Sequence, residues 1–452
     1  MHKNYFQLVL DRLVVISLFF LLAVIPLIIN PFALDYWYKP KIDSIYGLLI
    51  ILTAALLIRS AYSNKAHRIT GNPLLIPLVV FGAASILSTV FSIAPEISIW
   101  GDSFREEGIF TIISYIALTL IFSWAVESET QLDDLLRGLL ITAFAVSLYA
   151  LVQYAGYNPT QHFIPLMRSI ENRPGSTIGN PNFLGKFLVL IIPLFIVYYC
   201  RACTGFGRLC SATGCLIAGA ALIVTFTRAS WFSCFVSLLL LGVLLRGTAR
   251  RAAVKVFFAL GLLILLFIVL VEFKLPVSTS QQARRDAHKI TEKIITTFDY
   301  KKGGVGGRLY LWEKAILLIQ RRPFLGYGLD THAVAMEKFN LEYAQQFNYT
   351  GIIDRAHNNY LDIAIAQGLL GLVAYLSIIT TFLVWLVRTL KTEADASRQL
   401  LYCGILAAVC GYLLNDFFIF SVVSVSPTFW SLMGIAISIK RLNGLARPQN
   451  TV

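Results

Sequence analysis

The sequence contains few charged residues. Of its 452 residues, 14% are Asp, Glu, Lys or Arg, whereas 57% are hydrophobic. A soluble domain carries roughly 25% charged residues, and a disordered chain combines low hydrophobicity with high net charge. The composition therefore excludes an ordinary soluble enzyme and a disordered chain, and it indicates a large integral membrane protein. The net charge of +13 then reports membrane topology and anionic partners, and we expect no nucleic acid.

Several motifs of metal and nucleotide enzymes are also missing. The glycine run at 303–307 lacks the G-K-[ST] ending of a P-loop. No histidine has a second histidine or a glutamate at metal-binding spacing, and no D-x-D occurs in the long hydrophilic stretch described below. We therefore expect no metal and no cofactor. Four cysteines between 200 and 215 leave a zinc site open as an alternative to small apolar residues at a membrane edge.

Apolar runs occupy most of the chain. A helix needs about 20 residues to cross a bilayer, and the absence of an internal repeat argues against a transporter of two similar halves. We predict an all-α membrane protein with twelve spans, near residues 13–30, 44–59, 73–92, 109–126, 135–155, 183–200, 212–227, 230–246, 252–272, 369–388, 399–419 and 423–439.

The distribution of Lys and Arg predicts the orientation. If the chain starts inside, the inner short segments hold 18 Lys and Arg, and the outer ones, which include Lys186, hold 7. Cytoplasmic loops carry the excess of positive charge, so both termini are predicted inside. The organisation is then spans 1–9 in residues 1–272, an outer loop at 273–368, and spans 10–12 with a cytoplasmic tail at 369–452.

The outer loop has helical patterns of its own, which indicates a functional unit rather than a linker. We predict an amphipathic helix over 281–298, a glycine hinge at 303–307, and a helix over 308–320 that Pro323 ends. Asp354 is the predicted N-cap of a helix over 355–367, and Gly368 is predicted to end it before the next span.

Two residues are candidates for chemistry on their own properties. Arg228 lies between two apolar runs, and an arginine near membrane depth is costly unless it has an anionic partner. The alternative is an arginine in a short outer turn that reaches the lipid headgroups. His357 lies at the predicted start of a helix, and histidine exchanges protons near neutral pH. A single histidine is, however, more often structural.

The motifs resemble those of a known superfamily. His357 and Asn358, followed after nine residues by Gly368 and Gly371, resemble the H-[NSQ]-x9-G-x-x-[GTY] motif of O-antigen ligases. The segments 100–108, 173–182, 227–229, 307–312 and 323–328 are also similar to that superfamily, which includes O-antigen polymerases and bacterial protein O-oligosaccharyltransferases. Trp312 departs from the ligase pattern R-x3-L, which would place Leu four residues after Arg308.

The resemblance implies an enzyme of the bacterial cytoplasmic membrane whose active site faces the periplasm or exterior. It would transfer a glycan, with inversion and without a metal, from a polyprenyl-diphosphate carrier to a hydroxyl of a lipid A-core, glycan or protein acceptor. His357 would be the base, while Arg308 and Arg228 would hold the diphosphate, and Arg173, Arg105 and Asn358 would contact substrate. A polymerase, a protein O-oligosaccharyltransferase and, from another class, a flippase remain alternatives.

Overall fold

The structure is a computed structural model that describes residues 2–32, 35–62, 71–157, 173–272, 305–347 and 351–446. Within these ranges the chain forms helices and loops, and no strand occurs. The predicted all-α class is therefore confirmed for the described part of the chain. The predicted helix over 281–298 and the first two glycines of the predicted hinge lie outside the described residues.

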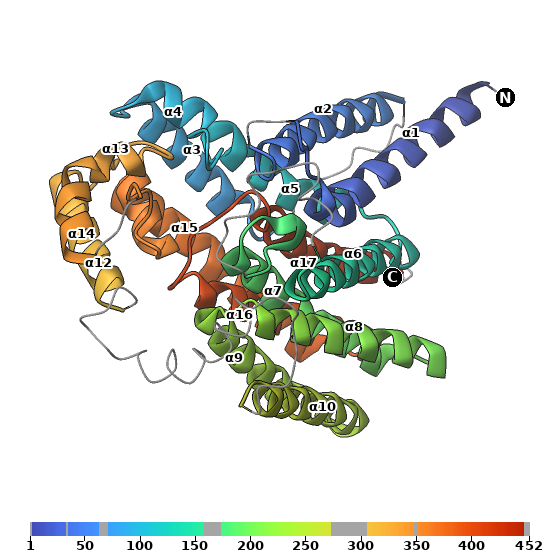
Figure 1. The fold of residues 1–452 in the computed structure, drawn as a ribbon. Helices are drawn as coiled ribbons and strands as arrows, with labels where there is room; N and C mark the ends of the chain where they lie inside the picture. The colour runs from blue at the N-terminus through green and yellow to red at the C-terminus, as the bar shows by residue number, and fades with distance from the viewer. Residues whose placement is uncertain are drawn as a thin grey trace.

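Among the described residues up to 272 there are ten α-helices, arranged as a bundle (Figure 1). They are α1 (His2–Phe19), α2 (Lys39–Tyr62), α3 (Leu75–Val90), α4 (Pro95–Trp100), α5 (Ile109–Ala125), α6 (Glu129–Tyr154), α7 (Pro181–Arg201), α8 (Gly205–Val224), α9 (Arg228–Leu244) and α10 (Gly247–Glu272).

Within the described residues, the second part of the chain contributes six α-helices, three of them at one edge of the bundle. They are α12 (Val305–Arg321), α13 (His332–Met336), α14 (Asn340–Phe347), α15 (Asn359–Thr392), α16 (Ala396–Asn415) and α17 (Ser426–Ala446). Every predicted span overlaps one long helix of the bundle. Within the described residues, 7 helices have the length and hydropathy to cross a membrane, and α3, α5 and α9 are shorter apolar helices. The number of twelve spans stays a prediction.

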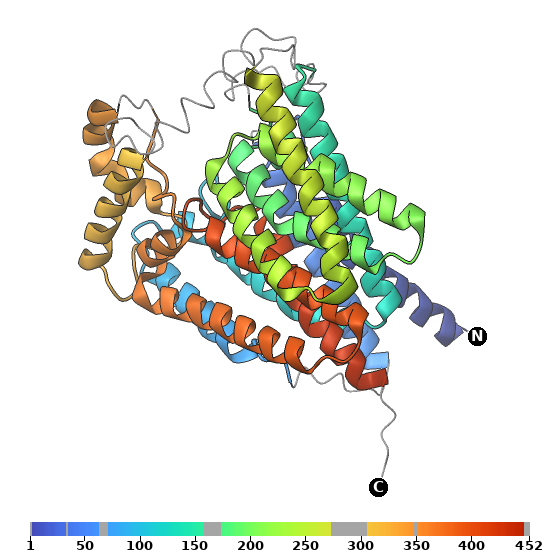
Figure 2. The same ribbon diagram turned by 90° about the horizontal axis from the view of Figure 1, so that it is seen from below.

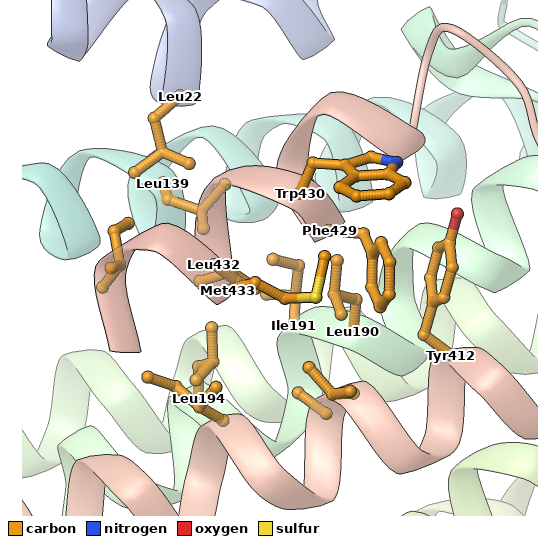
Figure 3. Close-up of a cluster of buried hydrophobic side chains, with 14 of the residues drawn as sticks. Leu22, Leu139, Leu190, Ile191, Leu194, Tyr412, Phe429, Trp430, Leu432 and Met433 are labelled. Carbon is orange, nitrogen blue, oxygen red and sulfur yellow. The ribbon is translucent and has the colours of Figure 1, made fainter. Parts of the chain in front are cut away.

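Helix α7 forms the centre of the bundle. In its apolar window 89% of the residues are buried, and α8, α9 and α16 pack against it. Figure 3 shows Leu190, Ile191 and Leu194 of α7 in a cluster with side chains of α6, α16 and α17. The rings of Tyr412 and Phe429 stack there with centroids 4.2 Å apart. Such burial of apolar area fixes how α16 and α17 sit against α7.

Helices α12, α13 and α14 lie together at one edge of the bundle, beside the start of α15 (Figures 1 and 2). They share a small core of their own, which includes Leu311, Met336 and Ile353. Helix α12 confirms the helix predicted over 308–320. The predicted hinge is wrong for residues 305–307, which form the first turn of α12. A Cβ at Gly307 would lie 2.7 Å from the Tyr343 hydroxyl oxygen, so this glycine permits close packing.

Helix α15 begins later than the sequence predicts. Asn358 is its N-cap, and the Asn358 side-chain oxygen accepts hydrogen bonds from the backbone N–H of Tyr360 and Leu361. The prediction that Asp354 caps this helix is wrong, because the Asp354 carboxylate instead binds Arg105. The predicted break at Gly368 is confirmed, since this residue leaves helical geometry at φ 65° and ψ −170°.

The break in α15 makes room for the segment 323–328. A Cβ at Gly368 would lie 2.2 Å from the backbone oxygen of Phe324, and one at Gly326 would lie 2.4 Å from backbone oxygens of α15. The backbone N–H of Leu369 donates to Pro323 across this contact at 2.7 Å. Two of the motifs that carry the resemblance therefore cross each other here, and both need glycine for steric reasons.

Candidate active site

The site is centred on the segment that leads into α15. His357 precedes the N-cap and has a left-handed backbone with φ 54°, a conformation in which histidine is enriched relative to most residues. Its ring lies 5.4 Å from the ring of Phe420, centroid to centroid. Asp362, in the first turn of α15, accepts the backbone N–H of Ala356 at 2.8 Å. Helix capping thus fixes the backbone on both sides of His357.

The surroundings of His357 keep its imidazole neutral. Burial and the nearby charge of Arg308 lower the pKa of His357 to about 4, although Asp354 opposes the shift. At neutral pH the ring is therefore unprotonated. A neutral imidazole next to cations can accept a proton from a hydroxyl, and this is the state that a general base requires.

Arg308 and Arg228 come together from distant parts of the chain. Arg228 is the first residue of α9, and Arg308 lies in the first turn of α12. The pKa of Arg308 is lowered by burial and then by the charge of Arg228. Arg308 therefore lies within electrostatic range of both Arg228 and His357. That the two arginines bind one diphosphate stays a prediction.

Arg105 approaches the same place from the loop between α4 and α5. Its guanidinium lies 4.8 Å from the centroid of the Phe420 ring, and its Nε donates to the Asp354 carboxylate at 2.7 Å. Burial alone would raise the pKa of Asp354, but Arg105 and Arg355 outweigh burial and lower it. Asp354 is therefore ionised, and an incoming phosphate would share Arg105 with it.

Arg173 and Asn358 lie near the site but have structural hydrogen bonds. Arg173 donates from Nε to the backbone oxygen of Thr225 at 2.7 Å, and from Nη2 to Asn182 at 3.0 Å and Thr227 at 2.9 Å. These hydrogen bonds fix the turn that precedes Arg228. The Asn358 side-chain oxygen caps α15, as described above. Substrate contact by either residue stays a prediction.

A buried ion network beside the site was not predicted. Arg355 pairs with Asp330, lies 3.8 Å from a Glu107 carboxylate oxygen, and donates to His332 Nδ1 at 3.0 Å. Asp330 also accepts the backbone N–H of Asp102 at 2.7 Å and that of Glu107 at 2.9 Å. The network ties the segments around residues 105, 330 and 355 together. The available sequence signal was the position of Arg355, two residues before His357.

The charged network leaves no room for a sugar. The adjoining cavity has a volume of about 70 Å³, whereas ligand pockets are typically about 300–1,000 Å³. Burial and the charge of Arg355 lower the pKa of His332 to about 3, so this ring is neutral. Its Nδ1 accepts from Arg355, and its Nε2 donates to the backbone oxygen of Asp362 at 2.8 Å. Both ring nitrogens of His332 therefore have hydrogen-bond partners within the protein.

A second buried ion pair fixes the backbone at Phe420. Lys186 of α7 pairs with Asp416, and both side chains are completely buried. Lys186 also donates to the backbone oxygen of Phe420 at 3.0 Å, and Asp416 accepts from the Asn359 amide at 3.1 Å. Counting Lys186 as a cation of an outer segment was therefore wrong. Lys186 lies inside an apolar helix, where Asp416, 230 residues away in sequence, compensates its buried charge.

The described helices and this charged cluster define a multi-pass membrane protein with a polar site at one end of its bundle. Residues 213–376, which include Arg228, Arg308, His357 and Asn358, match the family model of the O-antigen ligase. The resemblance inferred from the motifs is thereby confirmed over this region. Arg105 and Arg173 lie outside it.

Two curated proteins are similar to the chain. It is 23% identical over 367 residues to a ComP-specific O-oligosaccharyltransferase of Acinetobacter baylyi. This alignment covers 79% of this chain and 60% of that protein. It is 28% identical over 105 residues to an uncharacterised protein of Haemophilus influenzae, covering 23% of this chain and 26% of that protein. The chain thus matches less than two thirds of the length of each relative.

Proposed function

We propose that the chain is a membrane glycosyltransferase that moves a glycan from a polyprenyl-diphosphate carrier to an acceptor hydroxyl outside the cytoplasmic membrane. The observation that carries this proposal is the meeting of Arg228 and Arg308 beside a neutral His357. The charge of Arg228 lowers the pKa of Arg308, so an anion near both groups would be favoured, and the planar fork of a guanidinium suits phosphate oxygens.

The reaction is one displacement at the anomeric carbon of the donor sugar. The acceptor oxygen attacks this carbon, and its proton passes to the neutral imidazole of His357. The bond between the anomeric carbon and the diphosphate oxygen breaks, and the diphosphate leaves with its electron pair. Arg228 and Arg308 stabilise the charge that develops on the leaving group. The single attack inverts the anomeric configuration, and the guanidinium groups serve where other transferases use a metal ion.

The remaining predicted residues have supporting roles in this proposal. Arg105 and His357 both lie against the Phe420 ring, and Arg105 would bind a second part of the diphosphate or an acidic group of the glycan. Arg173 would act mainly by holding the turn before Arg228. Residues 273–368 would form the catalytic outer loop, and the lipid tail of the donor would lie among the helices of 1–272 and 369–452.

The acceptor defines three versions of the activity, which share this chemistry. The family match favours a ligase, with a lipid A-core as acceptor. The longer relative has a name that specifies an O-oligosaccharyltransferase, which makes a protein hydroxyl the second candidate. A polymerase would use another lipid-linked glycan. A flippase is the alternative from another class, and its central spans should carry polar groups along their length.

A deletion strain distinguishes these versions. Electrophoresis of its glycans should show unattached polymer on the lipid carrier for a ligase, and single-repeat caps for a polymerase. Loss of a glycoprotein with unchanged surface polysaccharide indicates an oligosaccharyltransferase. Normal transfer capacity with glycan trapped inside the cell would overturn the proposed enzyme and indicate a flippase.

The proposed orientation has a direct test of its own. In a variant without native cysteines, Asn340→Cys on α14 should react with an impermeant thiol reagent in intact spheroplasts. Gln399→Cys on α16, at the opposite end of the bundle, is the matched control and should react only after lysis. The reverse pattern would place the candidate site in the cytoplasm, where the proposed transfer cannot occur.

A further inference from the structure

A second polar feature lies at the end of the bundle opposite the candidate active site. Helices α7, α9, α15 and α16 each have one end near the site, at Pro181, Arg228, Asn359 and Asn415. Their other ends line a cavity of about 950 Å³, together with the first turns of α10. We call it the basic cavity. The 17 residues of α9 alone separate the two sites by about 25 Å at 1.5 Å per residue.

Five cations line the basic cavity. They are Arg208 of α8, Arg246, Arg251 and Lys255 around the start of α10, and Lys391 at the end of α15. None of the described residues that line it is acidic. In the described part of the chain, Arg246, Arg251, Lys255 and Lys391 take part in no ion pair. Their charges therefore accumulate around one hollow.

The rest of the lining is suited to a lipid. Apolar side chains of α9, α15 and α16 form part of the wall, among them Val243, Val387 and Leu406. Val243 and Val387 are exposed on the surface of the bundle. The cavity thus joins a charged rim to an apolar wall at the end of the helices, which is where the headgroup region of a bilayer meets its hydrocarbon region.

The start of α10 adds to the attraction for an anion. Thr248 and Ala249, in its first turn, line the cavity, and this helix runs for 26 residues from Gly247. Free backbone N–H groups and the positive end of the helix dipole favour negative charge at such a start. The effect supports the five cations, which remain the main feature of the cavity.

We propose that the basic cavity binds the phosphate headgroup of one anionic glycerophospholipid from the leaflet opposite the candidate active site. The cations hold the phosphate, and the acyl chains lie along the apolar wall of α9, α15 and α16. Because the cavity holds the ends of four helices that also form the candidate site, the bound lipid stabilises their arrangement. In the predicted orientation this is the cytoplasmic leaflet. The proposal does not depend on the transferase activity.

The chain offers a matched pair of variants. Arg251→Gln with Lys391→Gln removes one lining cation from α10 and one from α15. Arg250→Gln with Arg388→Gln removes one exposed cation from each of the same helices, and neither residue lines the cavity. Both pairs change the net charge equally, so they separate a built site from general positive charge at the membrane surface.

The experiment measures lipid binding to the purified full-length chain in neutral detergent. Thermal unfolding is followed by tryptophan fluorescence during titration with phosphatidylglycerol, phosphatidylcholine, glycerol 3-phosphate or inorganic phosphate. Phosphatidylglycerol should raise the unfolding temperature in a saturable way, and phosphatidylcholine should not. The two soluble phosphates should bind much more weakly, because they lack the acyl chains.

The cavity pair should weaken the apparent affinity about 25-fold, at about fivefold for each cation near a membrane surface. The control pair should bind as the wild type does. If the cavity pair fails to fold, Arg251→Gln and Lys391→Gln are tested singly, with about fivefold expected for each. Equal binding of both lipids, equal loss in both pairs, unchanged binding in the cavity variants, or equally tight binding of free phosphate would each overturn the proposal.

Discussion

Two groups of charge lie near Phe420, and they are built in opposite ways. In the first, Arg355 is enclosed by Asp330, Glu107 and His332. In the second, burial and the charge of Arg228 lower the pKa of Arg308, and burial and the charge of Arg308 lower the pKa of His357. The Cζ atom of Arg355 lies 5.6 Å from the centroid of the Phe420 ring, and the ring centroid of His357 lies 5.4 Å from the same point.

The difference separates a structural role from a chemical one. The Arg355 network satisfies its own charges, and its adjoining cavity is too small for a sugar. It therefore holds three loop segments in place. The arginines of the second group bring like charges together at some electrostatic cost, which a bound diphosphate would reverse. Mutations in the first group should lower stability, and mutations in the second group should lower activity.

The largest expected effect is the loss of transfer in His357→Ala. Removing a general base typically lowers the rate by about 10²–10⁴-fold. Transfer by the purified variant, measured with saturating lipid-linked donor, should fall within this range while the protein still accumulates in the membrane. Turnover near that of the wild type would show that His357 is structural.

Arg355→Gln should instead destabilise the protein. It leaves Asp330 and Glu107 buried without their cation, and breaking a buried pair costs about 3–5 kcal/mol. Unfolding of the detergent-solubilised protein measures the loss. Arg105→Gln breaks the more exposed pair with Asp354 and should cost about 1 kcal/mol or less.

A double variant provides the internal check on this network. Arg355→Gln with Asp330→Asn should be more stable than Arg355→Gln alone, because it also removes an uncompensated carboxylate. A stable Arg355→Gln protein with little activity would contradict the division of roles, since it would place Arg355 in the chemistry.

The pH dependence of transfer tests whether Arg308 and Asp354 lie close to His357. Because the pKa of His357 is lowered to about 4, transfer should be nearly constant from pH 8 down to about 5 and fall as the ring becomes protonated near pH 4. Arg308→Gln removes a cation that lowers this pKa, so the residual activity should fall at higher pH. Asp354→Asn should move the fall to lower pH. Identical profiles in all three proteins would contradict the proximity of these groups.

The same shift predicts a dependence of stability on pH. The unfolded histidine has a pKa of about 6.5, so between about pH 6.5 and 4 the unfolded chain binds the proton that folded His357 does not. Folding stability from this group is therefore full above about pH 6.5 and is lost as the pH falls toward 4. His357→Gln should remove this component.

The smallest expected effect concerns Asn358. Asn358→Ala removes the N-cap of α15 and should lower stability by about 1 kcal/mol. Asn358→Asp keeps an oxygen that can cap the helix and should restore most of this stability. Reduced transfer in a stable Asn358→Asp protein would support the substrate contact that the motif implies, and unchanged transfer would leave Asn358 as the cap alone.

The helices could be predicted because hydrophobicity is local information. Every long apolar run became a helix of the bundle, and the break at Gly368 followed from its motif. That Arg228 acts on Arg308 across about eighty residues of sequence was expected because a shared ligand was proposed for them, and the binding of that ligand stays a prediction. In each case the signal lay in a short stretch of sequence or in known chemistry.

Other features depend on contacts between distant segments and left no local signal. Asp354 has the sequence of an N-cap, but Arg105, 249 residues earlier, takes its carboxylate. The glycine before Arg308 resembles a hinge until Tyr343 is placed against it. The sequence places Lys186 among the cations of the outer segments, whereas in the fold Lys186 pairs with Asp416. In each case the role of the residue depends on which distant residue contacts it, and that contact is known only from the fold.

The central claim is that Arg228 and Arg308 bind one diphosphate with their guanidinium forks. The direct measurement is transfer by Arg228→Lys, Arg308→Lys and the double variant, with and without EDTA. We expect both single variants to be impaired at unchanged net charge, because a point charge does not replace a bidentate fork. We also expect the two losses to be non-additive in the double variant, and EDTA to leave the wild type active. Full activity in both lysine variants, or EDTA inhibition that Mg²⁺ or Mn²⁺ reverses, would contradict the claim.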